Sequence, residues 1–234
     1  AWCVAMLLFM VSFWGLSQLT VERDTPAGPS TSYLDQLVAG FRHLLERTDL
    51  RLLLALTALN GLLGRTIIEL LPALSGQVLR GGSADLAVLV AMAGLGSVLG
   101  GLLVSRQAAD LSRLLTLVCM AISLAALSLI SLQWFTGLTG LAVWVSSLSV
   151  VTTIAGTGSQ TLIQLTAKSE YRGRVMSVWT MLAMGAPALG AALLGAGVDG
   201  FGFSRVSLVA GSLGICLVAG LYARRSGLLT PDNP

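Results

Sequence analysis

The chain has 234 residues, of which 55% are hydrophobic and only 11% are charged, and its formal net charge is +3. Soluble domains carry about 25% charged residues, so this deficit and a mean hydropathy of +0.84 indicate an integral membrane protein. The basic residues are spread between apolar runs instead of forming one patch, which argues against nucleic acid as a partner.

Seven apolar runs are long enough for a membrane-spanning helix, which needs about 20 residues. They lie at 1–19, 52–78, 86–105, 114–134, 138–163, 175–198 and 204–223. The runs are too long for barrel strands and lack period-two alternation. The sequence therefore predicts an all-α integral membrane protein with seven transmembrane helices, surrounded by membrane lipid.

The first run, 1–19, has no basic n-region and no cleavage site, so we interpret it as a span whose start is a cut edge and not as a signal peptide. Segment 20–49 begins as a flexible linker, "ERDTPAGPSTS". Apolar residues then recur at helical spacing, which predicts an amphipathic helix on the cytoplasmic membrane surface. A connector is favoured over a docking site for a partner, and His43 in this segment is assigned no chemistry.

Run 52–78 contains Arg65 and Glu69 on one helical face. An arginine at bilayer depth costs about 2.5–3.5 kcal/mol on insertion scales. A structural ion pair remains an alternative, but we favour a face that lines a substrate or proton pathway, and we include Asn60 in it. Pro72 is expected to loosen the outer end of the same helix.

Two spans, 86–105 and 175–198, have small residues at four-residue spacing, which allows helices to pack closely. These residues are Ala93, Ser97 and Gly101 in the first span, and Ala183, Pro187, Ala191 and Gly195 in the second. The motifs "LGGLL" at 99–103 and "LGAAL" at 189–193 also repeat, each in the second span of a three-span group. This repetition of a motif in corresponding spans indicates two inverted three-helix units.

Polar side chains recur about every 3.6 residues along 138–163 and slightly beyond it, so they form one stripe on a helix. They are Ser146, Ser149, Thr153, Thr157, Gln160 and Gln164. A polar stripe does not face lipid, where it would lack hydrogen-bond partners. Interhelical hydrogen bonding and a cavity lining are equal alternatives, and we place Ser149, Thr153, Gln160 and Gln164 on the candidate pathway.

The distribution of lysine and arginine predicts the orientation in the membrane. If the connection after the first run is cytoplasmic, eleven basic residues lie inside and only Arg80 and Arg205 lie outside. The C-terminus and the tail 226–234 are then cytoplasmic, and a cell (plasma or inner) membrane is the expected location. The three cysteines all lie in apolar runs, so they are expected to be small buried hydrophobes and not disulfides.

Two stretches of the sequence resemble the major facilitator superfamily. Residues 65–106, "RTIIELLPALSGQVLRGGSADLAVLVAMAGLGSVLGGLLVSR", are similar to its seventh and eighth spans. Residues 164–199, which contain "RGRVMS", are similar to its tenth-to-eleventh loop and eleventh span. The closest branch comprises proton-driven drug and siderophore exporters, of the macrolide-efflux and enterobactin-exporter-like type.

The resemblance implies that 1–19 corresponds to the sixth span, 20–49 to the central loop and 50–225 to a six-helix C-terminal bundle of two inverted repeats. The first five spans are absent, so a missing N-terminal half-bundle is an expected partner, with a small-molecule substrate and a coupling proton. A charged gating loop is implied at Arg106, Asp110 and Arg113, with Arg172 and Arg174 in the loop before the 175–198 span. The sequence departs from the family here, because the usual compact Asp–Arg pairing is missing from this loop, and plain positive-inside anchoring is an equal alternative.

Other classes fit the residues less well. A retinal protein needs a lysine in its last helix, but Lys168 lies in a loop, and receptor signatures are missing. No cluster of Cys, His, Asp and Glu suits metal catalysis, and His43 is not placed for a nucleophile in the membrane. We therefore expect no enzyme, metal or cofactor. A non-transporting membrane fragment or assembly partner remains the main alternative, because alternating access needs two bundles.

Overall fold

The computed structural model describes residues 6, 9–11, 13–15, 18, 47–79, 82–107, 110–135, 137–167 and 169–223. Contacts divide the chain into Ala1–Gln36 and Leu37–Pro234, and the helical bundle belongs to the second unit. In the first unit the residues at 6, 9–11 and 13–15 are helical and residue 18 lies in a turn, whereas the rest of the predicted span 1–19 lies outside the described residues. The predicted amphipathic helix, His43 and the tail also lie outside them.

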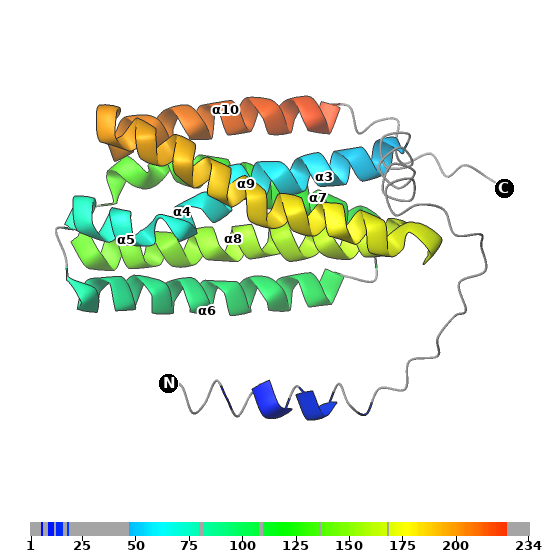
Figure 1. Ribbon diagram of the computed structural model, residues 1–234. Coiled ribbons are helices and arrows are strands. Elements are labelled where there is room, and N and C mark those ends of the chain that lie inside the picture. The colour runs from blue at the N-terminus through cyan, green and yellow to red at the C-terminus, as the bar shows by residue number, and fades with distance from the viewer. Residues whose placement is uncertain are drawn as a thin grey trace. The chain divides into compact units, whose positions relative to one another are not determined.

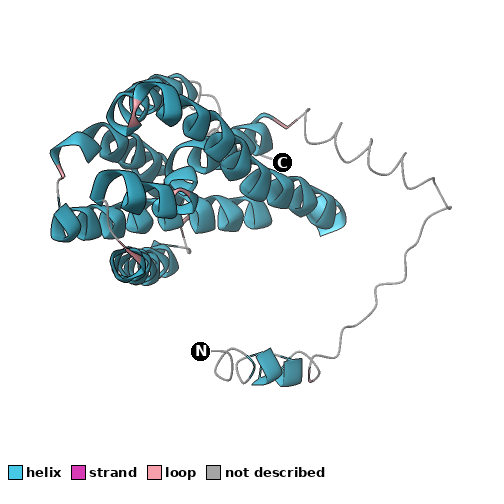
Figure 2. Ribbon diagram, turned by 60° about the vertical axis from the view of Figure 1, so that its left-hand side comes forward, coloured by secondary structure: helices cyan, strands magenta, loops and turns pink. Residues whose placement is uncertain are grey.

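Six helices of the described part are long and apolar enough to cross a membrane (Figure 1). They are α3 (Thr48–Asn60) with its continuation to Glu69, α6 (Ser83–Gln107), α7 (Leu111–Ser131) with the 3₁₀ turn η3 (Leu132–Trp134), α8 (Gly137–Thr166), α9 (Arg172–Phe201) and α10 (Phe203–Ala223). The described residues contain no β-strand, as the coloured view in Figure 2 also shows. The prediction of an all-helical membrane protein is confirmed, and so are six of its apolar runs.

Two glycines in the left-handed region mark helix boundaries. Gly202 has φ +80° and separates α9 from α10 by one residue, and Gly137 has φ +79° at the start of α8. Residues with a Cβ rarely adopt this conformation, so these glycines allow sharp reversals between neighbouring helices. Other connections rely on capping, as at Asp110 before α7.

The first span of the bundle is not one regular helix. After α3 comes a π-helical turn, η1 (Gly61–Arg65), followed by α4 (Thr66–Glu69). Leu70 has φ −88° and ψ 7°, and beyond it lie α5 (Leu71–Leu74) and a second π-helical turn, η2 (Ser75–Leu79). Pro72 is the second residue of α5 and cannot donate a backbone hydrogen bond, which agrees with the predicted loosening. The π-helical turns were not predicted.

The first span lies in the middle of the bundle. Of its most apolar window 67% is buried, against 22% for α9 and for α10. The helix α6 packs along α8, α9 packs against η1 and α4, and α7 contacts both α8 and α10. Figure 1 shows α6 beside α8. Large apolar side chains on the outer faces of α6, α9 and α10 remain exposed, as expected for surfaces in lipid.

Close packing uses different small residues from those predicted. On α6 the residues that contact α8 are Gly96 and Gly100, where an added Cβ would meet the carbonyl oxygens of Ser146 and Val150. By contrast, Gly101 has open space at its Cβ position, so of the predicted Ala93–Ser97–Gly101 face only Ala93, which is buried, belongs to the contact. The buried face of α6 contains Ala93, Gly96 and Gly100, which are three and four residues apart and therefore lie on one side of the helix.

On α9 the predicted face was also only partly correct. Ala186, Pro187 and Gly190 lie against the first span, whereas Gly195 has open space at its Cβ position. A Cβ on Gly61 would lie 2.8 Å from Ala186 Cβ and 3.1 Å from Pro187 Cδ. The absence of a side chain at Gly61 therefore brings the π-helical turn directly against α9.

Candidate functional site

A cavity of about 280 Å³ lies between the first span, α8 and α9. Its lining consists of Thr57, Asn60, Gly61, Arg65, Thr152, Thr153, Gly156, Thr157, Gln160, Trp179, Thr180, Ala183 and Met184. Seven of these thirteen residues carry a hydroxyl or amide group, although most of the lining surface is apolar, and Arg65 supplies the only charge among them. The volume is near the lower limit for small-molecule sites. The cavity therefore suits a small polar ligand or a group at one end of a larger one.

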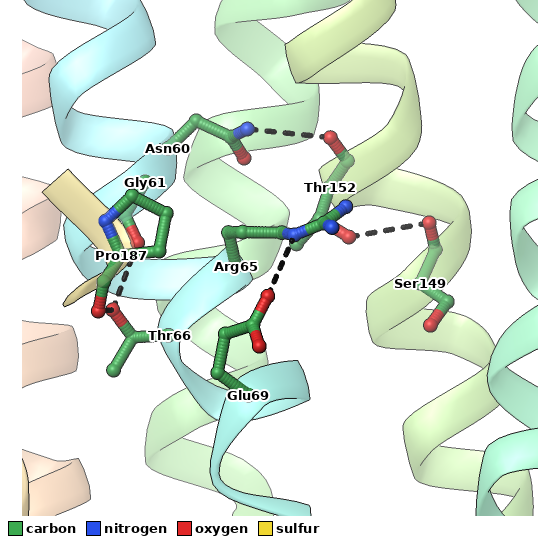
Figure 3. A network of polar contacts seen from close by, with 8 residues as sticks. All are labelled: Asn60, Gly61, Arg65, Thr66, Glu69, Ser149, Thr152 and Pro187. Carbon is green, nitrogen blue, oxygen red and sulfur yellow. Dashed lines mark hydrogen bonds and ion pairs between the residues drawn. The ribbon is translucent and has the colours of Figure 1, made fainter. Parts of the chain in front are cut away.

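Asn60 joins α3 to α8 at this cavity. Its Nδ2 donates a hydrogen bond of 3.3 Å to the carbonyl oxygen of Thr152, and its side chain is 6% exposed (Figure 3). The close approach requires small residues, because a Cβ on Gly64 would collide with the Thr152 methyl group and one on Gly156 would lie 3.5 Å from Asn60 Nδ2. Asn60 and Arg65 therefore both lie on the cavity wall.

The π-helical turn before Arg65 is held by Thr66. The Thr66 backbone N–H bonds Gly61 O, and the hydroxyl donates to the same oxygen at 2.8 Å and to Pro187 O at 3.3 Å (Figure 3). Thr66 is fully buried, and Gly190 makes room for its hydroxyl. A π-turn inserts an extra residue and so rotates the side chains that follow it. This rotation positions Arg65 relative to α8 and α9.

Arg65 and Glu69 form the predicted pair. Arg65 Nε lies 3.4 Å from Glu69 Oε1, and the two side chains are 59% and 53% exposed. Arg65 lines the cavity, while Glu69 lies one turn further along, outside the lining. The pair therefore lies on an open face of the bundle and not in its apolar core, which allows it to contact water, substrate or another bundle.

The polar stripe of α8 is divided between two surroundings. Thr153, Thr157 and Gln160 line the cavity, as a pathway requires. Ser149 is 2% exposed and packs beside Gly96 of α6, so it lies at a dry helix contact and its predicted place in the pathway is not supported by the packing. Gln164 is exposed and lies outside the lining. One regular stripe lies in both surroundings because α8 packs against α6 at Ser149 and lines the cavity further along, from Thr153 to Gln160.

We expect single cysteines in α8 to report this division. In a chain whose natural cysteines are replaced by alanine, Thr157→Cys and Gln160→Cys should react with a hydrophilic thiol reagent at least about tenfold faster than Ser149→Cys or Leu148→Cys, because burial excludes reagent from a thiol. The measurement is the labelling rate of the purified chain in lipid nanodiscs. Equal rates at all four positions would contradict a water-filled cavity.

The charged loop between α6 and α7 has a structural role. Asp110 Oδ1 accepts hydrogen bonds from the backbone N–H groups of Ser112 and Arg113, so Asp110 is the N-cap of α7. Its other oxygen lies 3.0 Å from Arg113 Nε. Asp110 and Arg113 therefore form an ion pair within the first turn of α7, three residues apart, although the sequence lacks the family's compact Asp–Arg motif. Arg106 is exposed at the end of α6.

The second predicted group of gating charges lies at the start of α9. The Arg174 guanidinium carbon is 5.6 Å from the centre of the Tyr171 ring, a cation–π contact, while Arg172 is exposed. None of these five charged residues lines the cavity. The structure thus separates the loop charges from the polar cavity.

The sequence analysis missed the contribution of α9 to this site. Trp179, Thr180, Ala183 and Met184 complete the cavity wall, and Thr57 and Thr152 add hydroxyls from α3 and α8. The sequence offered a partial signal, because Thr180 and Ala183 lie three residues apart and so share a face. The sequence does not show that this face of α9 lines a cavity, because the cavity forms only together with residues of the first span and α8.

Six apolar helices around a polar cavity define the class of membrane transporters. A family model described as transmembrane secretion effector, one of the major facilitator superfamily, matches residues 1–229. The chain belongs to this family of major facilitator transporters. A comparison with curated proteins gave no match.

Proposed function

We propose that this chain acts as the C-terminal half of an exporter that moves a small molecule across a cell membrane by proton-coupled alternating access. The observation that carries the proposal is the cavity beside the Arg65–Glu69 pair, lined by polar side chains of the first span, α8 and α9. The resemblance to drug and siderophore exporters supports export over import. No chemical conversion of the substrate is involved.

The pathway runs along the cavity wall. Asn60, Thr153 and Gln160 contact the substrate, and Arg65 with Glu69 lies at the cavity's open side. Glu69 carries the coupling proton, since a carboxylate that alternates between an ion pair and a protonated state can take up and release one. Gln164 lies further along α8, beyond the cavity, where the substrate would pass on its way in or out.

Two inverted three-helix repeats explain the packing of the bundle. The first repeat contains the first span, α6 and α7, and the second contains α8, α9 and α10. The second helix of each repeat packs against the first helix of the other, as α6 does with α8 and α9 with η1 and α4. The third helices, α7 and α10, pack together. Such matching contacts between the two repeats are expected when the repeats are related by a twofold axis in the membrane plane.

Alternating access requires a second bundle that rocks against this one. The N-terminal half-bundle is the proposed partner, and the C-terminus is cytoplasmic according to the distribution of basic residues. The test is transport by the chain combined with an N-terminal half-bundle of the same family in inside-out vesicles, with a radiolabelled macrolide as probe. We expect accumulation that stops when the proton gradient is collapsed. Accumulation that persists without the gradient would refute proton coupling.

A further inference from the structure

Two buried polar atoms on the cavity wall have no hydrogen-bond partner in the described part of the chain. They are Asn60 Oδ1, an acceptor, and Trp179 Nε1, a donor. Nearly all buried polar groups in folded proteins are hydrogen-bonded, and a buried group left unpaired costs stability. Two such atoms of complementary type, from α3 and α9, therefore indicate that a ligand completes both.

The orientation of the Asn60 amide follows from its neighbour. The carbonyl oxygen of Thr152 can only accept a hydrogen bond, so the amide nitrogen of Asn60 must face it, at 3.3 Å. The amide oxygen is consequently the atom left without a partner. Exchanging the two would place two acceptors together and leave the Thr152 carbonyl without this donor.

The hydroxyl groups of the lining add further acceptors. Thr57 donates its hydrogen to Leu53 O at 2.9 Å, Thr152 to Ser149 O at 3.2 Å and Thr180 to Met176 O at 2.9 Å. Each hydroxyl oxygen can then only accept another hydrogen bond. The cavity lining therefore offers several hydrogen-bond acceptors. Trp179 Nε1 is a donor that has no hydrogen-bond partner in the described part of the chain.

We propose that this cavity binds a neutral group that carries an N–H or O–H donor next to an acceptor, as in an amide or a hydroxy-carbonyl. The ligand donates to Asn60 Oδ1 and accepts from Trp179 Nε1. An anionic group can accept from Trp179 Nε1 but has no hydrogen to donate to Asn60 Oδ1, and the charge of Arg65 is already paired with Glu69. An ammonium group can donate to Asn60 Oδ1 but cannot accept from Trp179 Nε1, and Arg65 repels it. This inference rests on the proposed function, in which the cavity receives the substrate, and it specifies the substrate's chemistry.

The first test compares two tryptophans of the full chain in nanodiscs. Trp144 Nε1 donates to Ser128 O at 2.9 Å and to Ser131 Oγ at 3.2 Å, whereas Trp179 Nε1 has no partner. Without ligand, Trp144→Phe should lower the melting temperature by about 2–4 °C, because it removes hydrogen bonds within the protein. Trp179→Phe should lower the melting temperature by clearly less, because it removes no hydrogen bond within the described part of the protein. Equal losses would show that Trp179 already has a partner and would overturn the inference.

The second test uses three probes of similar size that differ in one polar group. Benzamide has a donor and an acceptor, acetophenone has only the acceptor, and benzoate is an anionic acceptor. By isothermal titration to the full chain, benzamide should bind about tenfold more tightly than either, because an unpaired Asn60 oxygen costs roughly that factor. Trp179→Phe should weaken benzamide binding by about tenfold, and Trp144→Phe should leave it unchanged.

The outcomes separate this inference from the proposed function. Tighter binding of benzoate or acceptance of all three probes with equal affinity would overturn the ligand chemistry, while gradient-driven transport of the macrolide would still support the transporter. No saturable binding of benzamide would also overturn the ligand chemistry. Selective benzamide binding without any transport by the combined halves would support the ligand site and refute the proposed transport.

Discussion

Glu69→Gln is expected to abolish gradient-driven transport, with a loss of about 100-fold or more, in the chain combined with an N-terminal half-bundle. Glutamine keeps the size of the side chain but cannot take up and release a proton, and positioned proton transfers contribute about 10²–10⁴-fold to rates. Expression and exchange without a gradient should change little, because the side chain lies on an open face and not in the core. The measurement is substrate accumulation in inside-out vesicles with an imposed proton gradient.

The matched control is Asp85→Asn. Asp85 lies in the first turn of α6 and outside the cavity lining, so its neutralisation should leave transport within about twofold of normal, since surface changes away from special features have small effects. If Asp85→Asn and Glu69→Gln reduce transport equally, the effect of Glu69 does not come from proton carriage.

The pair itself provides a further control. Arg65→Met together with Glu69→Leu removes both charges, and a structural ion pair often tolerates such replacement. The proton-carrier hypothesis predicts that this double variant folds but does not transport against the gradient. Normal accumulation by the double variant would end the hypothesis and leave Arg65 and Glu69 as packing residues.

Gly96→Val is expected to destabilise the bundle by about 3 kcal/mol or more, or to prevent folding. A Cβ at Gly96 would collide with the Ser146 carbonyl oxygen and lie 2.9 Å from Ser149 Cβ. The first obstacle is backbone, so α8 as a whole must move away, and overpacking of this kind costs about 1–3 kcal/mol or more. The measurement is the unfolding free energy in mixed detergent micelles.

Gly101→Val provides the control, because the same substitution occurs on the same helix where nothing lies within 4 Å of the added atom. Its effect should stay within about 0.5 kcal/mol, the usual range for exposed positions. A Gly101→Val loss as large as that of Gly96→Val would mean that valine destabilises α6 through the helix itself and not through contact with α8.

Much of the fold was predictable because membrane insertion imposes a local rule. Each backbone N–H and C=O must be paired within its own helix, so a sufficiently long apolar run becomes a helix wherever it lies. Six predicted runs from 52 to 223 are helices for this reason. Periodicity within one helix was equally local, so Thr153 and Gln160 share a face and Arg65 pairs with Glu69.

The identity of helix neighbours depends on tertiary structure. Hydropathy does not distinguish a glycine that contacts a carbonyl oxygen from one that faces lipid. The predicted contact residue on α6 was Gly101, whereas in the structure Gly96 contacts α8 and Gly101 has open space at its Cβ position. Ser149 and Thr153 belong to one stripe, yet only Thr153 lines the cavity, because α6 covers the part of α8 that holds Ser149.

The apolar runs and their periodicity were sufficient to predict the six membrane-spanning segments from 52 to 223 and the two polar segments that meet at the site. Tertiary structure alone decided that η1 is π-helical, because Thr66 bonds both Gly61 O and Pro187 O across the contact with α9. It also decided that Trp179 lies on the cavity wall opposite Asn60 and α8. The reason is physical: helix formation satisfies hydrogen bonds within one segment, whereas a cavity and its unpaired groups exist only where surfaces of several helices meet.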